Sequence, residues 1–336
     1  MTELLQKPPT DPHRIAQHYL TRFTSEEGLL LHYWRGEWWT YTGNHYTMLP
    51  DAELRSDLTR VTQANMDGRY ARRRRAKVRS QTKKAPKAIP VTTSMVNNTR
   101  NQLISLPGVE VKSVREMPLW LETPPNGLNG TILACSNGLL PLSTPLPPTP
   151  SPHSPQWFSA FRLPVAYNPT ATCPRWDAFL DEVLEGDRSR VDFMHEWFGY
   201  CLTPDTSIER FVVLVGEGQN GKGTVLHVLQ SLLGDDNVST VPLEDFHDKF
   251  SLITTVGKLA NISTDIGQIA AAAEGKIKGF VSGEPQTFRG LYDDAFSTRP
   301  TARLVFSANN FPRFTDRSSG LWRRMTVIPF NLQIPD

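Results

Sequence analysis

The 336-residue chain is long enough for one large domain or two, and its 39% hydrophobic content excludes a wholly disordered protein. It contains no run of about eighteen apolar residues and begins with no basic-then-apolar leader, so we expect a soluble, cytoplasmic protein (host cytoplasm, if a phage encodes it). The three scattered cysteines, Cys135, Cys173 and Cys201, exclude a disulfide framework and the usual zinc-ligand spacing.

Residues 11–65 have the pattern of a folded region. Within it, residues 32–41 are rich in aromatic side chains and predict a β-hairpin that turns at Arg35-Gly36. Such aromatic residues stack on nucleic-acid bases in some proteins, but paired strand aromatics pack a small core more often. We therefore predict a core role for them.

A strongly basic segment follows. Residues 69–87 contain ten Lys and Arg and no acid, although the whole chain has a net charge of only +2. Without these ten, 26 basic residues remain against 34 acidic ones. Concentrated positive charge predicts a polyanion contact, with Arg72, Arg73, Arg74 and Arg75 as the candidate DNA-binding residues. A solvated arm without a partner and a localisation signal remain alternatives, and we expect the arm to be partly helical or disordered.

The next elements are short. Residues 131–135 predict a strand before a tight turn at Asn137-Gly138. Seven prolines in residues 141–155 predict an extended connector rather than a ligand for a proline-binding module. Residues 176–184 and 191–198 have the spacing of amphipathic helices.

The most informative segment runs from Gly216 to Thr224. It follows the apolar run 211–215 and precedes a helical pattern at 225–233, which is the strand–loop–helix context of a phosphate-binding loop. Glycines let consecutive N–H groups converge on an anion, and the lysine reaches the terminal phosphates. The predicted nucleotide-binding residues are Gly216, Gly218, Asn220, Gly221, Lys222, Gly223 and Thr224. Gly223 replaces the usual Ser or Thr after the lysine, so Thr224 becomes the candidate hydroxyl ligand of Mg²⁺.

From residue 210 onward, strands and helices alternate as in an open α/β sheet. We predict strands at 210–215, 237–241, 257–264, 302–307 and 325–330, with the phosphate loop at the carboxyl end of the first strand.

Three further features complete the predicted ATP site. Asp265 ends a strand, where a carboxylate can hold Mg²⁺ and polarise water, although a surface Asp has the same pattern. Asn309 follows another strand, where an amide can sense the γ-phosphate, although Asn-Asn before Pro is also a turn signal. Arg323 and Arg324 precede the last strand and predict either ordinary ion pairs or an arginine finger.

Together these motifs resemble a superfamily 3 (AAA+) helicase of the phage and plasmid primase–helicase family, related to the poxvirus primase-helicase. The resemblance covers residues 130–336 and rests on the order of Asn137-Gly138-Leu139-Leu140, Tyr167-Asn168-Pro169, Pro174-Arg175-Trp176, Gly199-Tyr200-Cys201-Leu202, the phosphate loop, 260–266, Lys278…Ser282-Gly283-Glu284, 289–292, 306–309 and Arg323-Arg324 with 328–330.

The resemblance implies specific roles. Lys222 contacts phosphate, Asp265 is the Walker B acid that holds Mg²⁺, Asn309 is sensor 1, and Arg324 or Arg323 is the finger. Lys278, Arg289 and Tyr292 lie in the segment that resembles the DNA-gripping hairpin; exposed loop charge is the alternative for each. It also implies an AAA+ P-loop fold with a five-stranded parallel sheet, a hexameric ring, ATP between subunits and 3′→5′ movement on single-stranded DNA.

The implied organisation is an N-terminal α+β region at 1–140, a linker at 141–155, a helical domain at 156–204 and the helicase core at 205–336. Relatives often carry a second acid where Thr264 stands, so an acid from elsewhere is expected to supplement Asp265. Many relatives also have a primase domain, for which the N-terminal region is too short. Relatives usually continue into a winged-helix domain beyond the position of Asp336, so a truncated chain and a naturally short one both fit.

We therefore predict an ATP-hydrolysing replicative helicase of a phage or mobile element, working with a separate primase or polymerase. Two alternatives stay open. One is an origin-recognition or loading module that binds ATP as an assembly switch and hydrolyses little of it. The other is a nucleotide kinase, because Gly-Lys-Gly-Thr also occurs in adenylate-kinase-like loops.

Overall fold

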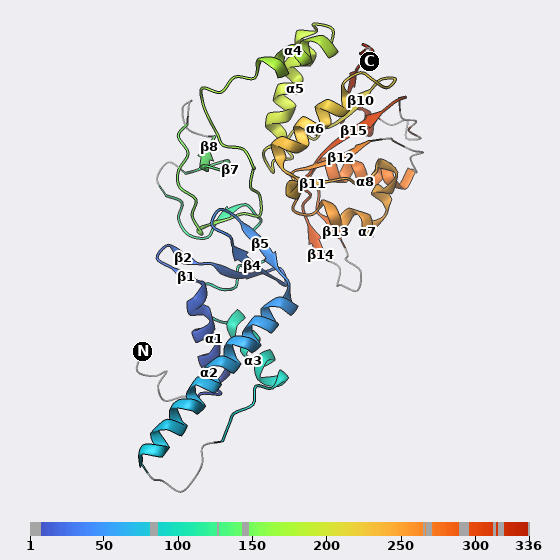
Figure 1. The fold of residues 1–336 in the computed structure, drawn as a ribbon. Helices are drawn as coiled ribbons and strands as arrows, with labels where there is room; N and C mark the ends of the chain where they lie inside the picture. The colour runs from blue at the N-terminus through green and yellow to red at the C-terminus, as the bar shows by residue number, and fades with distance from the viewer. Residues whose placement is uncertain are drawn as a thin grey trace. The chain divides into compact units, whose positions relative to one another are not determined.

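The computed structural model describes residues 8–80, 87–125, 128–142, 148–264, 266, 271–288, 296–311, 314 and 319–334. The chain divides into two compact units (Figure 1). Unit 1 comprises residues 1–123 and 153–160, and unit 2 comprises residues 124–152 and 161–336. The domain boundaries that the sequence predicts after residues 140, 155 and 204 stay predictions.

Unit 1 combines three helices with short antiparallel strands. Its elements are α1 (Pro12–Leu20), a 3₁₀ turn (Thr21–Phe23), β1 (Thr24–Ser25), β2 (Gly28–Leu29), β3 (Leu31–Trp34), β4 (Glu37–Tyr41), β5 (Tyr46–Leu49), α2 (Asp51–Ser80), α3 (Thr93–Ile104), β6 (Leu119–Trp120) and β9 (Trp157–Phe158). Strands β3, β4 and β5 form a meander in which Tyr33 lies opposite Trp38. The predicted hairpin is confirmed, with positive φ angles at Arg35 and Gly36 in the turn.

The aromatic residues of this meander pack a core. Trp38 is fully buried, and Tyr46, Trp34 and Trp39 have ring centroids 4.8, 6.0 and 6.2 Å from the buried ring of Phe158. Edge-to-face contacts of this kind are a favourable arrangement of aromatic rings. The meander therefore uses its aromatic side chains for packing, as the sequence predicts.

Unit 2 contains the main sheet. Its elements are β7 (Ile132–Cys135), β8 (Gly138–Pro141), α4 (Pro174–Val183), α5 (Arg188–Cys201), β10 (Phe211–Val215), α6 (Lys222–Leu233), 3₁₀ turns at Asp235–Asn237, Leu243–His247 and Ile253–Thr255, β11 (Val238–Ser239), α7 (Lys249–Leu252), β12 (Ala260–Thr264), α8 (Ala271–Val281), β13 (Gln286–Phe288), β14 (Phe296–Thr298), β15 (Arg303–Ala308), α9 (Ser319–Trp322) and β16 (Met325–Pro329). Beyond the turn after β7, Ser151 and Leu139 exchange backbone hydrogen bonds of 2.8 and 2.9 Å, so the end of the proline-rich stretch lies beside β8.

Five parallel strands form the main sheet in the order β11-β12-β15-β10-β16, which confirms the predicted five-stranded parallel sheet. From β10 the chain crosses to the far edge at β11 and returns through β12 and β15. It then passes β10 to add β16 on the other side. The connections that leave the adjacent strands β10 and β15 thus run in opposite directions along the sheet. In open α/β sheets, ligands bind at the carboxyl ends of strands near such a point.

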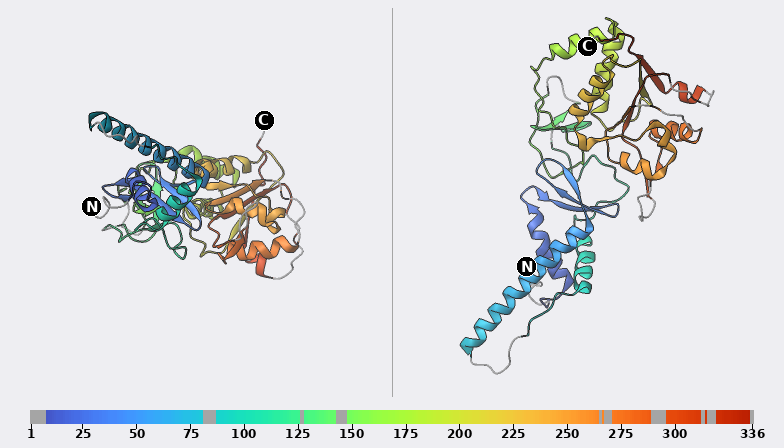
Figure 2. Two further views of the ribbon diagram at one scale, coloured as in Figure 1. Left: turned by 90° about the horizontal axis from the view of Figure 1, so that it is seen from below. Right: turned by 45° about the vertical axis from the view of Figure 1, so that its right-hand side comes forward.

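Helices cover both faces of this sheet. Val212 and Leu214 belong to the core that contains the buried residues of α4, α5 and α6, whereas Phe211 and Val213 belong to the core with α8 and the 3₁₀ turn before α7. Alternate side chains of one strand therefore enter two cores, as expected for a central parallel strand buried on both faces. Figure 2 shows the sheet between these helical layers. No helix in the described part of the chain is both long and apolar enough to cross a membrane.

Candidate phosphate-binding loop

The loop between β10 and α6 turns sharply because three of its residues adopt positive φ. Gly218 has φ 55°, Gln219 φ 45°, and Gly221, which precedes the first residue of α6, φ 85°. Side chains disfavour this region of φ, so glycine at two of these positions lowers the cost of the curve. The loop delivers the chain to the start of α6, whose first N–H groups have no acceptor within the helix.

Two glycines of the loop are also required by packing. A β-carbon on Gly216 would lie 2.2 Å from the carbonyl oxygen of Phe330. One on Gly221 would lie 2.9 Å from Phe179 and from Val183 of α4. At Gly223, in contrast, nothing lies within 4 Å of the added atom. At Gly216 and Gly221 the absence of a side chain lets the loop pack closely against Phe330 and α4. At Gly223 it leaves free space beside the start of α6.

Lys222 lies over the inside of the loop. Its Nζ donates to the carbonyl oxygen of Gly216 at 2.5 Å and to Oδ1 of Asn220 at 2.9 Å. Asn220 in turn donates through Nδ2 to the carbonyl of Phe330 at 3.1 Å. Lys222 and Asn220 are both buried, at 6% and 3% exposure. Asn220 therefore links the loop lysine to the end of β16, a contact between distant segments that sequence spacing alone does not reveal.

The carboxyl ends of three adjacent strands meet at this loop. Val215 pairs with Ala308, and Ser307 pairs with Thr264, so β10, β15 and β12 end side by side. The N–H of Gly216 donates to the carbonyl of Ala308 at 3.2 Å. Exposed Asn309, which follows Ala308 directly, is thereby brought to the entrance of the loop. Asp265, which follows Thr264 in sequence, lies outside the described residues.

A cavity of about 480 Å³ adjoins the loop beside β12. Its lining includes Gly223 from the first turn of α6 and Ser263 and Thr264 from the end of β12. Thr224 is exposed in the same first turn. Hydroxyl groups thus share the lining of this space with apolar and other polar side chains, namely Leu226, His227, Gln230, Pro242 and Ile262. Among the described residues, no group of three His, Cys, Asp or Glu side chains is placed to hold a metal ion.

The two arginines before β16 lie at the opposite end of the sheet. The carbonyl of Arg324 accepts from the N–H of Phe211, the first residue of β10, at 2.8 Å. Its guanidinium donates to Glu209 Oε2 at 3.0 Å, Ser282 Oγ at 2.7 and 2.9 Å, and the carbonyl of Gly320 at 2.9 Å. Arg323 is exposed and, within the described ranges, makes no hydrogen bond or ion pair. The structure therefore separates both arginines from the phosphate loop of the same chain by the length of β10.

The predicted DNA-contacting residues differ in their exposure and in whether the structure describes them. Lys278 is half-buried in α8. Arg289 and Tyr292 lie outside the described residues. Arg72 to Arg75 are exposed on α2 in unit 1.

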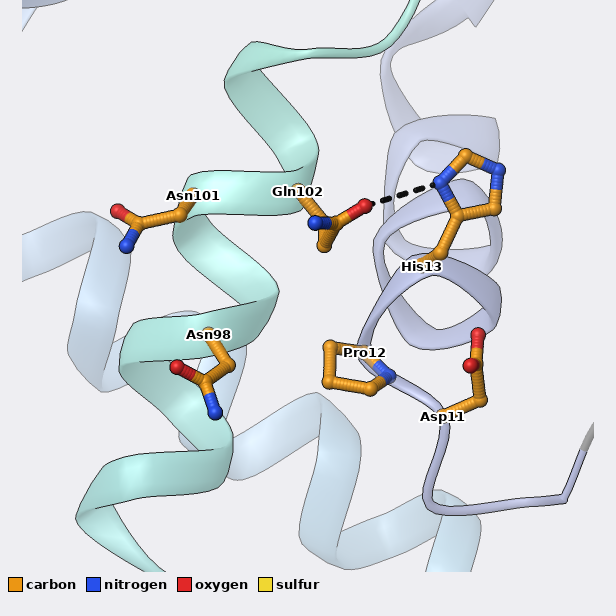
Figure 3. Close-up of a pocket in the computed structure, with 6 residues that line it drawn as sticks. All are labelled: Asp11, Pro12, His13, Asn98, Asn101 and Gln102. Carbon is orange, nitrogen blue, oxygen red and sulfur yellow. Dashed lines mark hydrogen bonds between the residues drawn. The ribbon is translucent and has the colours of Figure 1, made fainter.

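A second cavity of about 480 Å³ lies in unit 1 between α1 and α3 (Figure 3). Three of its polar side chains make contacts within the fold. The side chain of Asp11 caps α1 by accepting from the N–H of Arg14 at 2.9 Å, and His13 Nδ1 lies 3.2 Å from Gln102 Oε1. Capping of this kind satisfies a helix N–H that has no intrahelical acceptor. The cavity is remote in sequence from the phosphate loop and shares no residue with it.

Comparison with known protein families assigns the N-terminal half of the chain. The family model described as D5 N terminal like matches residues 13–185, more than half of the 336 residues. The chain belongs to the D5 N-terminal-like family. A second model, DUF5906, a family of unknown function, matches residues 214–324 of this D5 N-terminal-like protein, which contain the whole phosphate loop and the strands β12 and β15.

A viral relative and three solved structures are similar to the D5 N-terminal-like chain. "Putative helicase L207/L206" of Acanthamoeba polyphaga mimivirus is 26% identical over 160 residues, which are 44% of this chain and 16% of that protein. Three apo structures of the NrS-1 C-terminal region have TM-scores of 0.50, 0.55 and 0.50 at 11%, 10% and 11% identity. They match 96%, 96% and 95% of this chain, which covers 61%, 62% and 62% of theirs. The chain thus spans less than two thirds of each protein, and the structural likeness shows the fold alone.

Proposed function

We propose that this protein is an ATP-driven replicative DNA helicase of a phage or mobile genetic element, with an AAA+ P-loop core of the superfamily 3 type. The observation that carries the proposal is the buried lysine in a glycine loop at the carboxyl end of β10, where the connections from β10 and its neighbour β15 diverge. The D5 N-terminal-like family and the mimivirus relative named as a helicase support it. Single-stranded DNA is the proposed track, with a separate primase or polymerase as partner.

The loop geometry fits a triphosphate. Backbone N–H groups at the start of α6 carry partial positive charge that favours an anion. Lys222 is already held over the curve by Gly216 and Asn220 and would contact the terminal phosphates. Asn220 fixes the loop to β16, so the lysine is positioned before any ligand binds. Positioning of this kind lowers the cost of binding because little has to be ordered.

The chemical step would use the strand ends beside the loop. Thr224 and Asp265 are the proposed holders of Mg²⁺, which would neutralise charge on the phosphate oxygens when bound. Asn309, at the entrance of the loop, would orient the attacking water through its side-chain amide. Asp265 would accept a hydrogen bond from the same water and help to polarise it. Hydrolysis by in-line attack would then need one more positive group near the γ-phosphate.

We propose that a neighbouring subunit supplies this group. Arg323 and Arg324 precede Met325, which pairs with Phe211, whereas the phosphate loop follows Val215 at the other end of β10. The two sites are therefore about 16 Å apart along the strand. Because Arg323 is exposed and Arg324 is held by three partners, Arg323 is the better candidate for the arginine finger. A ring of subunits, which we take to be a hexamer, would place it at the next subunit's nucleotide.

The test is ATP hydrolysis by the intact chain with and without single-stranded DNA. Lys222→Ala should lower the rate by at least 100-fold, since it removes the phosphate contact. Lys112→Ala, which removes an exposed lysine of unit 1, is the matched control and should hydrolyse ATP at the unaltered rate. Hydrolysis that Lys222→Ala leaves unchanged would overturn the proposed site.

One feature favours a second function, an ATP-dependent origin-recognition or loading module. Thr264 ends β12, where relatives often have an acid, and the loss of that carboxylate would weaken hydrolysis more than binding. In that case ATP would bind and promote assembly without turnover. ATP hydrolysis by the intact chain and by Asp265→Asn decides between the two functions. Equally negligible hydrolysis by both proteins supports the assembly switch, and a clear loss in Asp265→Asn supports the helicase.

A further inference from the structure

Helix α2 is packed along only the first part of its length. Its buried residues are Leu54, Leu58, Thr62 and Met66, spaced by four. Leu54 and Leu58 belong to the core that contains the buried residues of α1 and α3. Beyond Met66 no buried residue follows in the part of α2 whose side chains are described. The helix nevertheless continues to Ser80 and extends past α1 and α3 (Figures 1 and 2). With a rise of 1.5 Å per residue, residues 67–80 form an extension of about 21 Å.

Six of the fourteen residues of this extension are arginine. Arg72, Arg73, Arg74 and Arg75 are all exposed, and among the described residues none of them makes a hydrogen bond or ion pair. Successive helical residues are rotated by about 100°, so four in a row present charge on every side of the helix. The single acid of the extension, Asp67, accepts from Gln63 at 2.9 Å. The described residues of unit 1 therefore do not neutralise the positive charge of these four arginines.

The base of the extension shows the resulting repulsion. Partial burial, together with the positive charges of Arg14, Arg72 and Arg73, lowers the pKa of Arg69. Arg14 belongs to α1, so the positive region continues from the extension onto the neighbouring helix. Like charges three and four positions apart destabilise an isolated helix. A ligand with many negative charges would relieve this repulsion and stabilise the extension.

We propose that residues 67–80 of α2 dock into the major groove of double-stranded DNA. The major groove admits one α-helix and has a row of phosphates on each side, which matches arginines on all sides of the extension. Single-stranded DNA fits less well, because proteins bind it with aromatic stacking platforms, and the extension has one aromatic residue, Tyr70. The contact is with phosphates and carries no sequence preference. This surface adds duplex binding to the proposed function and uses none of the residues of the ATP site.

The experiment measures binding of the full chain to a fluorescent duplex of about two helical turns (~20 base pairs), without nucleotide, over a series of salt concentrations. The variant replaces Arg72, Arg73, Arg74 and Arg75 with Gln, which has a similar helix propensity. Its affinity for duplex should fall by at least about tenfold, and the slope of log K against log salt should decrease by about two to four. Circular dichroism checks that the helix content is retained.

Two controls make the result specific. Replacement of the same four residues with Lys keeps the charge. The slope of log K against log salt should then stay within about one of the wild-type slope. Arg60→Gln removes an exposed arginine from the packed half of α2, where it pairs with Asp57, and should leave duplex affinity within about twofold. An unchanged salt slope in the Gln variant, or a loss confined to single-stranded DNA or to an acidic protein probe, would overturn the proposal. Since no ATP is present, the answer is independent of whether the chain hydrolyses it.

Discussion

The backbone carbonyl of Arg324 accepts a hydrogen bond of 2.8 Å from the N–H of Phe211, which fixes the arginine pair at the amino end of the strand that leads to the phosphate loop. The two proposed halves of an ATP site therefore lie at opposite ends of β10, with the arginines on the segment before the neighbouring strand β16. Within one chain they are separated by the length of β10. This geometry makes a shared site between copies the simplest way for both halves to act on one nucleotide.

The two adjacent arginines should respond differently to substitution. Arg324→Ala removes hydrogen bonds to Glu209, Ser282 and Gly320 and should lower the free energy of unfolding by about 1–3 kcal/mol. Arg323→Ala, at an exposed side chain, should change it by less than about 0.5 kcal/mol. It should nevertheless lower ATP turnover by about 10³-fold. Urea denaturation and phosphate release measure the two effects. A stable Arg323→Ala protein with full turnover would show that Arg323 is not the finger.

The phosphate loop should tolerate an added methyl group at one glycine and not at another. Gly216→Ala would place a β-carbon 2.2 Å from the carbonyl oxygen of Phe330 and 2.3 Å from Nδ2 of Asn220. The loop would have to move, at a cost of about 1–3 kcal/mol in unfolding free energy and with weaker ATP binding. Gly223→Ala, with open space around it, should be as stable as the wild type or up to about 1 kcal/mol more stable. Equal unfolding curves for wild type and Gly216→Ala would contradict the contact.

The ion pairs at the start of α2 should make unit 1 sensitive to acid. Partial burial alone would raise the pKa of Asp51, but hydrogen bonds from Arg100 and Arg55 outweigh it, and the pKa is lowered from 3.8. A lowered pKa in the folded state means that the contribution is present above pH 3.8 and is lost as the pH falls through the lowered value. Asp51→Asn should therefore cost about 1 kcal/mol at pH 7.

Denaturation of wild type and Asp51→Asn at pH 7 and near pH 3 provides the check. The difference in unfolding free energy should shrink at the lower pH, where the wild-type carboxylate becomes protonated. Asp245→Asn, at a half-buried acid in unit 2, is a control for the loss of a carboxylate elsewhere. If the difference in unfolding free energy between wild type and Asp51→Asn is the same at both pH values, the ionised carboxylate of Asp51 does not stabilise the fold.

Local patterns in the sequence predicted much of unit 2. The apolar run 211–215, the glycine loop and the helix at 225–233 are contiguous, so their order alone predicts strand, loop and helix. The paired strand aromatics of unit 1 likewise predicted a hairpin with a packed core. In both cases the residues that determine the structure are neighbours in the chain or opposite each other across a short turn.

Long-range contacts could not be predicted in the same way. The partners of Arg324 include Ser282, 42 residues away, and Glu209, 115 residues away, and only the folded chain brings them together. The link from Asn220 to Phe330 spans 110 residues. The full length of α2 was also missed, because its buried positions end at Met66 and the arginine-rich sequence beyond has no apolar stripe. The functional roles of all the predicted site residues remain predictions, and Asp265, Arg289 and Tyr292 also lie outside the described residues.

The most direct test of the shared ATP site mixes two inactive variants. Lys222→Ala lacks the phosphate contact and Arg323→Ala lacks the proposed finger, so each alone should hydrolyse ATP at least 100-fold more slowly than the wild type. An interface is intact when one subunit retains Lys222 and its neighbour retains Arg323. If the subunits of an equal mixture exchange at random, about one quarter of the interfaces meet both conditions. The mixture should then recover DNA-stimulated turnover toward a quarter of the wild-type rate. A mixture no more active than the sum of its components, after the subunits have been exchanged, would contradict a site shared between subunits.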